Sequence, residues 1–181
     1  MEVITKKTSG LIEGTTLYKS SLVDLKENID YRGSFTEIFQ DYWNSAISPV
    51  QWSMIRSSEH VFRGMHYHRR HDEYFSIMNG SCYLGLKDMR TDSPTYLKTA
   101  LYYLCGEDLK ALIFPVGILH GWYYLEPSLH IQAVSESYKD YGEKYDTINT
   151  IIPNSTFWDN ETEYDVKKVL TETGDNYCLN N

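Results

Sequence analysis

Between about residues 50 and 140, apolar and polar residues alternate in short segments separated by residues that favour turns. Gly80, the Ser93-Pro94 pair and Pro115 mark three of these breaks. The pattern predicts strands in the segments 74–79, 81–88, 95–105, 110–115 and 129–138. Short strands with such breaks are typical of an all-β sandwich or barrel.

The C-terminal segment has a different, helical pattern. Asn160 and Glu163 have the spacing of a helix capping box, and Val166 and Leu170 follow at helical spacing. We therefore expect a short helix at about 160–174. The chain contains no stretch rich in proline, glycine or serine that would divide it, so residues 1–181 are expected to form a single domain.

Composition narrows the class of protein. The 181 residues include 17 Lys and Arg against 25 Asp and Glu, which gives a net charge of -8 and argues against nucleic acid as a partner. We find no apolar run long enough to cross a membrane, so no membrane partner is expected. Cys82, Cys105 and Cys178 are far apart in the sequence, which favours a reduced, cytoplasmic protein.

The segment at 63–80 carries a cluster of candidate metal ligands. His66 and His68 are two residues apart, so on a strand both side chains point to the same face. Glu73 and Gly80 follow, giving the spacing H-x-H-x4-E-x6-G. Imidazole and carboxylate groups suit transition-metal ions, so these residues are candidate ligands.

A second motif, P-x-G-x2-H, lies about forty residues later and ends at His120. The two motifs together resemble the signatures of the cupin superfamily of jelly-roll β-barrels. In metal-binding cupins the matching positions, here His66, His68, Glu73 and His120, hold a divalent metal ion. His60, His71 and His130 fall outside the pattern and are expected to be surface or structural residues.

A further series of motifs narrows the resemblance to one family of cupins. It consists of Asp30–Glu37, which reads DxRGxFxE, then Gln51 and Arg56, Arg63–His66, Asp88–Arg90, Ser93–Thr95 and His120–Trp122. In this order the motifs resemble the dTDP-4-dehydrorhamnose 3,5-epimerase family, with an epimerase-like core at about 20–150. That family consists of dimeric cupins that modify nucleotide-linked 4-keto sugars for bacterial surface polysaccharides of the O-antigen type.

The resemblance implies roles for individual residues. His66 takes the position of the base that removes a proton beside the ketone. The DxRGxFxE segment would cross from the partner subunit of a homodimer. The remaining residues of the expected substrate site are Arg32 and Arg63 for the diphosphate, Phe35 and Glu37 for the nucleotide base, and Gln51, His120 and Tyr138 in the same pocket.

Three positions depart from the family pattern. Counting from His120 places the catalytic tyrosine of the family at Ala133, which has no acidic proton. Counting back from Gly80 places the family lysine at Glu73, and His68 replaces a glutamine. Because inversion at carbon needs a base on one face and an acid on the other, we expect no efficient 3,5-epimerisation unless Tyr124 or Tyr138 substitutes.

The His66/His68 pair also resembles the sugar 3,4-ketoisomerases, cupins that move protons on one face of the sugar. Three functions remain open from the sequence. The first is an isomerase or epimerase acting on a nucleotide-diphospho-sugar, with His66 and His68 as catalytic residues. The alternatives are a metal-dependent cupin enzyme and a catalytically inactive nucleotide-sugar binder.

Overall fold

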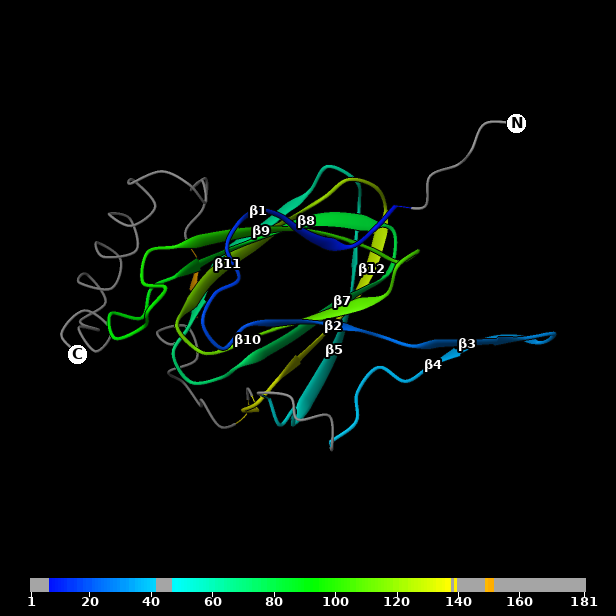
Figure 1. The fold of residues 1–181 in the computed structure, drawn as a ribbon, viewed down its shortest axis with the longest axis horizontal. Helices are drawn as coiled ribbons and strands as arrows, with labels where there is room; N and C mark the ends of the chain where they lie inside the picture. Colours follow the sequence, from blue (N-terminus) through cyan, green and yellow to red (C-terminus); the bar gives the residue numbers. More distant parts are fainter. Residues whose placement is uncertain (1–6, 42–46, 138, 140–148, 152–181) are drawn as a thin grey trace.

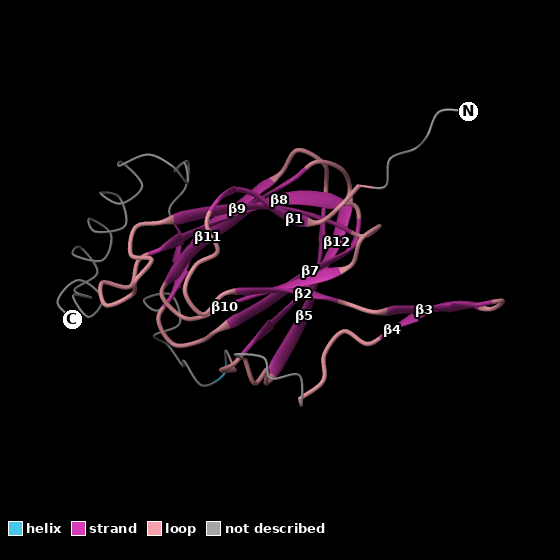
Figure 2. Ribbon diagram, in the orientation of Figure 1, coloured by secondary structure: helices cyan, strands magenta, loops and turns pink. Residues whose placement is uncertain are grey.

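The computed structural model describes residues 7–41, 47–137, 139 and 149–151. Almost all regular structure in these residues is β-strand (Figure 2). The strands are β1 Gly10–Gly14, β2 Ser21–Asp24, β3 Glu27–Asp30, β4 Gly33–Thr36, β5 Gln51–Ser57, β6 Phe62–His68, β7 Glu73–Asn79, β8 Ser81–Asp88, β9 Thr99–Cys105, β10 Lys110–Phe114, β11 Ile118–Tyr124, β12 Ser128–Val134 and β13 Asn149–Ile151.

Two antiparallel sheets face each other and form a barrel (Figure 1). One sheet has the order β1-β9-β8-β11-β6-β13 and the other the order β2-β10-β7-β12-β5. Strands close in sequence, such as β6 and β7, lie in different sheets, whereas β6 pairs with the distant β11. This arrangement confirms the expected all-β jelly-roll barrel.

The predicted strands agree with the observed ones except at their ends. Strand β8 has the predicted bounds of 81–88, and β7, β10 and β12 differ from their predictions mainly at the ends. Strand β9 begins at Thr99 rather than at residue 95, because the preceding residues form a loop. The helix expected at about 160–174 lies outside the described residues.

The space between the sheets contains an apolar core to which both sheets contribute. Phe75 and Leu112 from the five-stranded sheet pack with Leu84, Tyr102 and Trp122 from the six-stranded sheet, and all five are buried. Their alternation along each strand explains why one face of each sheet is apolar. Within the described residues, the structure contains no helix with the length and apolar character needed to span a membrane.

Two of the sequence motifs, Asp88–Arg90 (DMR) and Ser93–Thr95 (SPT), come together where β8 ends and the loop to β9 begins. They surround the buried carboxylate of Asp88. Asp88 accepts hydrogen bonds from the Arg90 guanidinium at 2.7 and 2.8 Å and from the Ser93 and Thr95 hydroxyls at 2.6 Å. Although burial opposes a charge on Asp88, these hydrogen bonds hold its pKa below the usual value. The two motifs therefore hold the loop between β8 and β9 in one conformation. This structural role explains why they contain an aspartate, an arginine and two hydroxyl residues.

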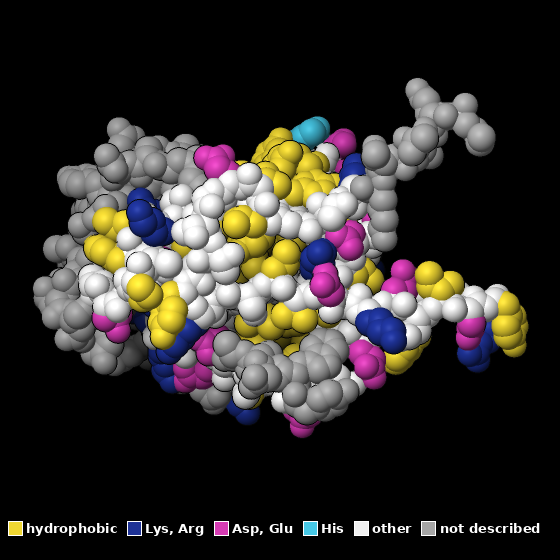
Figure 3. Space-filling model, in the orientation of Figure 1, with side chains coloured by type: hydrophobic (Ala, Val, Ile, Leu, Met, Phe, Trp, Pro, Cys, Tyr) yellow, Lys and Arg dark blue, Asp and Glu magenta, His cyan; other side chains and the backbone are white. Residues whose placement is uncertain are grey.

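Strands β3 and β4 form a hairpin that projects away from the barrel (Figure 1). Apolar side chains are exposed along the hairpin (Figure 3). The exposed fraction is 75% for Ile29, 97% for Tyr31 and 65% for Phe35. The Arg32 guanidinium forms an ion pair with Asp30 at 2.5 Å at the hairpin tip. An isolated two-stranded hairpin is marginally stable in water, and exposed apolar side chains of this kind are typical of interaction surfaces.

Candidate functional site

Three histidines of the six-stranded sheet gather between the two sheets. His66 and His68 lie on β6, and His120 lies on β11 in register with His66. The ring centroids of His66 and His120 are 5.6 Å apart, and those of His68 and His120 are 5.0 Å apart. The two-residue spacing thus places both β6 histidines on the inner face, as the sequence predicted.

Two glycines allow the strands that carry these histidines to approach closely. Gly64 on β6 has a φ of +138°, and a Cβ atom there would lie 2.7 Å from the Cα of Gly121 on β11. The pairing of β6 with β11 is irregular at this point, between His120 and Trp122. Glycine at position 64 of the RGxH motif therefore allows β6 to pack closely against β11, and this packing positions His66.

Glu73 reaches the histidines from the opposite sheet, at the start of β7. Its Oε1 lies 2.8 Å from Nε2 of His68, and its Oε2 lies 3.4 Å from Nε2 of His120. The Glu73 side chain is 1% exposed. The structure therefore brings together all four residues of the predicted metal site.

Two further side chains join this cluster, which we call the histidine cluster: His66, His68, His71, Glu73, His120 and Gln132. His71 is 1% exposed, and its Nε2 lies 3.4 Å from Oε1 of Glu73. The Gln132 amide on β12 donates a hydrogen bond to the same oxygen at 3.2 Å. The expectation of a surface or structural His71 missed this contact, because His71 precedes β7 in a segment without a regular period.

Burial controls the charges in the histidine cluster. Burial, with a further contribution from neighbouring His68, lowers the pKa of His66 to about 4, and burial lowers that of His120 to about 3. Burial alone would raise the pKa of Glu73, but the facing His120 and His68 hold it well below the usual value. At neutral pH, His66 and His120 are thus neutral and Glu73 carries a negative charge.

Ala133, to which the count along the sequence assigns the family tyrosine, does not face the histidine cluster. Ala133 packs with Tyr74 and Ile113 in an apolar cluster distinct from the core between the sheets. Gln132, one residue earlier, points to Glu73 instead. Successive side chains on a strand point to opposite faces, and a count along the chain takes no account of the length of the β11–β12 turn. Gln132 therefore occupies the site-facing position.

His130 and Tyr124 form a separate buried pair. The Tyr124 hydroxyl lies 2.5 Å from Nδ1 of His130, whose ring centroid is 4.5 Å from that of Phe75. Burial raises the pKa of Tyr124 to about 12, which makes it a poor acid. His130 therefore has the structural role expected from the sequence, and exposed His60 contacts the Tyr123 hydroxyl at 3.0 Å.

The residues expected to bind the nucleotide fall into two groups. Gln51 begins β5, and Arg63 on β6 donates a hydrogen bond to Ser57 at 2.9 Å, so both belong to the barrel. Arg32 and Phe35 lie on the projecting hairpin, where they line a pocket of about 260 Å³. Glu37 follows the hairpin and is exposed. The single chain does not bring the two groups together, and Tyr138 lies outside the described residues.

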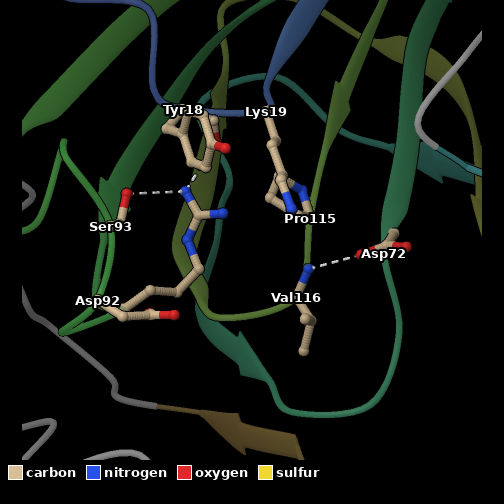
Figure 4. A pocket seen from close by; sticks show the side chains of 8 residues that line it. Tyr18, Lys19, Asp72, Asp92, Ser93, Pro115 and Val116 are labelled. Atoms are coloured by element: carbon tan, nitrogen blue, oxygen red, sulfur yellow. Dashed lines mark hydrogen bonds between the residues drawn. The ribbon is translucent and has the colours of Figure 1, made fainter. Parts of the chain in front are cut away.

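A pocket of about 310 Å³ opens beside the loop that Asp88 organises (Figure 4). It is lined by Tyr18, Lys19, Asp72, Arg90, Asp92, Ser93, Pro115 and Val116. The Arg90 guanidinium donates a hydrogen bond to the Tyr18 carbonyl, and the Val116 amide donates one to Asp72, so the polar groups are engaged in holding loops. None of the substrate or metal residues predicted from the sequence lines this pocket.

A two-sheet jelly roll of this topology is the fold of a cupin. The model of the dTDP-4-dehydrorhamnose 3,5-epimerase family matches residues 14–155. The chain therefore belongs to the dTDP-4-dehydrorhamnose 3,5-epimerase family, as the sequence motifs predicted.

Individual relatives agree with this assignment. The chain is 30% identical over 112 residues to the spore coat polysaccharide biosynthesis protein SpsL of Bacillus subtilis, covering 62% of this chain and 71% of that protein. It is 29% identical over 119 residues to the probable low-salt glycan biosynthesis epimerase Agl13 of Haloferax volcanii, covering 64% and 76%. The crystal structure of dTDP-4-dehydrorhamnose 3,5-epimerase from Bacillus anthracis with TDP and PPi bound has a TM-score of 0.69 and 25% identity, covering 83% of this chain and 88% of that one.

Proposed function

We propose that the protein binds a nucleoside-diphosphate-linked 4-keto sugar and uses His66 to remove a proton from the carbon beside the ketone. The observation that carries this proposal is the placement of His66, from the RGxH motif, at the inner face of a barrel of the epimerase family. Because its imidazole is neutral at pH 7, it can accept a proton without first losing one.

The rest of the histidine cluster favours proton transfer on one face of the sugar. The count along the sequence places the family lysine at Glu73, and Gln132 on β12 faces Glu73 with a hydrogen bond of 3.2 Å. A carboxylate opposes the negative charge of an enolate, and an amide does not release a proton as an acid. We therefore propose an isomerase that returns the proton from the side on which it was removed, with His68 beside His66, and without efficient 3,5-epimerisation.

The names of the relatives support a place in polysaccharide synthesis. SpsL is named for spore coat polysaccharide biosynthesis and Agl13 for glycan biosynthesis. We propose that this chain modifies a sugar nucleotide for a surface polysaccharide, of which O-antigen is one type. The buried free thiols of Cys82 and Cys105 support a reducing compartment, the cytoplasm.

Incubation of the protein with dTDP-4-keto-6-deoxyglucose in D₂O tests the reaction. We expect deuterium to enter the sugar beside the ketone, followed by NMR, without accumulation of the 3,5-double epimer that a coupled reductase would consume. Parallel reactions with GDP- and CDP-linked 4-keto sugars identify the nucleotide. Binding of a nucleoside diphosphate without exchange into any of these sugars would instead establish an inactive nucleotide-sugar binder.

Arg63→Ala is expected to weaken nucleoside diphosphate binding by about 1–3 kcal/mol, because a guanidinium forms charge-assisted hydrogen bonds with phosphate oxygens. The positive charge of Arg63 already influences the pKa of both His66 and His130, which supports a position near the inner face. Isothermal titration with dTDP measures the change. Arg56→Ala, at an exposed arginine on β5 of the opposite sheet, is the control. Equal affinities for the two variants would contradict the proposal.

The exposed hairpin supports a homodimer with two-fold symmetry, in which β3 and β4 of one protomer contribute Arg32 and Phe35 to the site of its partner. Ile29→Ser combined with Phe35→Ser should convert the dimer to a monomer of 21.1 kDa, because the exposed apolar hairpin would lose its partner surface. Sedimentation velocity at micromolar concentration measures this. Ile12→Ser, which alters an apolar side chain 54% exposed on β1, should leave the dimer intact. A monomeric native protein would refute the assembly.

A further inference from the structure

Hydrogen bonds link the exposed Arg63 on β6 to the buried pair of Tyr124 and His130. The Nε atom of Arg63 donates a hydrogen bond to the Ser57 hydroxyl at 2.9 Å. The Ser57 side chain in turn forms a hydrogen bond with the Tyr124 hydroxyl, which lies 2.5 Å from Nδ1 of His130. We call these four residues, Arg63, Ser57, Tyr124 and His130, the Arg63 chain.

Every hydrogen bond of the Arg63 chain has a fixed direction. A guanidinium only donates, so the Ser57 oxygen accepts from Arg63 and the Ser57 proton is left for Tyr124. Burial raises the pKa of Tyr124, and the Ser57 hydrogen bond opposes this rise, as a donor to the phenolic oxygen does. The Tyr124 proton then goes to Nδ1 of His130, so the neutral imidazole carries its own proton on Nε2.

The inner end of the Arg63 chain is held in place by the packing of the core. His130 is 0% exposed, and its ring centroid lies 4.5 Å from that of Phe75 and 5.5 Å from that of Trp122. Tyr124 is buried in the apolar core between the two sheets. Because closely packed side chains keep one rotamer, the Tyr124 oxygen is a fixed point to which the Ser57 hydroxyl is oriented.

Arg63 benefits from such a fixed point because its side chain is exposed. An exposed arginine samples many rotamers, and selecting one of them when a ligand binds costs conformational entropy. The bond to Ser57 uses Nε alone. The two terminal nitrogens of a guanidinium are the pair that forms a fork with phosphate oxygens. The Arg63 chain therefore fixes the side chain without using the atoms that suit a phosphate.

We propose that Ser57, Tyr124 and His130 are positioning residues, which hold the Arg63 guanidinium in the orientation that binds the diphosphate of the substrate. The inference rests on the proposed function, because that proposal assigns Arg63 to the diphosphate. The buried tyrosine–histidine pair thus has a task besides filling the core, since it anchors the hydrogen bonds that orient an exposed cation. None of the three positioning residues needs to contact the ligand.

NMR of the ligand-free protein tests the orientation of Arg63 directly. The ¹⁵Nε signal of Arg63 is assigned by its loss in Arg63→Ala, and its order parameter should be close to the rigid value of about 0.85 in the native protein. The order parameter should fall below about 0.6 in Ser57→Ala and to an intermediate value in Tyr124→Phe. Tyr102→Phe is the matched control, since Tyr102 is a buried tyrosine of the same core, and it should leave the value unchanged.

Titration with dTDP measures the consequence for binding. Ser57→Ala and Tyr124→Phe should each weaken dTDP binding by about 3- to 10-fold, the usual effect of one lost hydrogen bond, and Tyr102→Phe should bind as the native protein does. In the deuterium-exchange reaction, Ser57→Ala and Tyr124→Phe should raise KM and leave kcat nearly unchanged. This difference is expected because the Arg63 chain acts on the diphosphate and not on the proton transfer.

An Arg63 order parameter that is low in the native protein, or unchanged in folded Ser57→Ala and Tyr124→Phe, would overturn the inference. Native affinity for dTDP in both folded variants would overturn it as well. Circular dichroism shows whether each variant is folded, and substitutions at two residues keep the test valid if one of them fails to fold. Failure of the native protein to bind any nucleoside diphosphate would refute the proposed function instead, and the order parameter would still decide whether the chain holds Arg63.

Discussion

Replacing His66 with glutamine is expected to reduce deuterium exchange into the 4-keto sugar by about 10²- to 10⁴-fold, the usual contribution of a general base. Glutamine keeps a polar side chain of similar reach but cannot accept the proton. The strand pairing that places residue 66 opposite His120 is made by the backbone and remains in the variant. The initial rate of deuterium incorporation, followed by NMR, measures the effect.

Two control measurements show whether the loss of exchange is specific to the role of His66 as the base. His60→Gln changes an exposed histidine that contacts Tyr123, and it should exchange at the native rate. Binding of dTDP to His66→Gln should be nearly unchanged, because His66 is assigned to the sugar rather than to the diphosphate. Native exchange rates in folded His66→Gln would show that another group is the base and would end the proposed mechanism.

The largest effect on stability is expected for Asp88→Ala, which should lower the free energy of unfolding by about 3–5 kcal/mol. The substitution removes the acceptor of hydrogen bonds from Arg90, Ser93 and Thr95. The Arg90 side chain, 15% exposed, would then keep a largely buried charge without its carboxylate. Chemical denaturation measures the loss, and Tm should fall on the order of 10 °C.

Asp92→Ala provides the control in the same loop. Asp92 is exposed, so its replacement should change the free energy of unfolding by less than about 0.5 kcal/mol. If both variants unfolded at the same denaturant concentration, the Asp88 hydrogen bonds would contribute little to stability. The DMR and SPT motifs would then need another explanation.

The barrel and the centre of its site were predictable because they depend on local periodicity. Strand β8 was correct at both ends, and the two-residue spacing of His66 and His68 placed both on the inner face. Glu73 was recognised from the spacing of the motif that resembles the cupin signature. For the strands and the two histidines, the period of two along a strand carried the information.

Other features depend on contacts between distant parts of the chain. The family tyrosine was assigned to Ala133, but the outward packing of that residue with Tyr74 shows that a shift of one residue moves a side chain to the other face. His71 was missed because it precedes the strand that carries Glu73, in a segment without a regular period. The DMR and SPT motifs were recognised, yet only their folding around Asp88 shows what they do.

The division of the histidine cluster between the two sheets has a consequence for how its chemistry can change. His66, His68 and His120 stand on strands locked together by the close approach of Gly64 and Gly121. Glu73 and Gln132 come from the opposing sheet, where their side chains can be exchanged without disturbing that contact. The six-stranded sheet thus holds the imidazoles at a fixed spacing, and the five-stranded sheet carries site residues that can be replaced. Redesign of the reaction is best begun on β7 and β12, where a new charge alters the environment of the imidazoles and leaves their spacing intact.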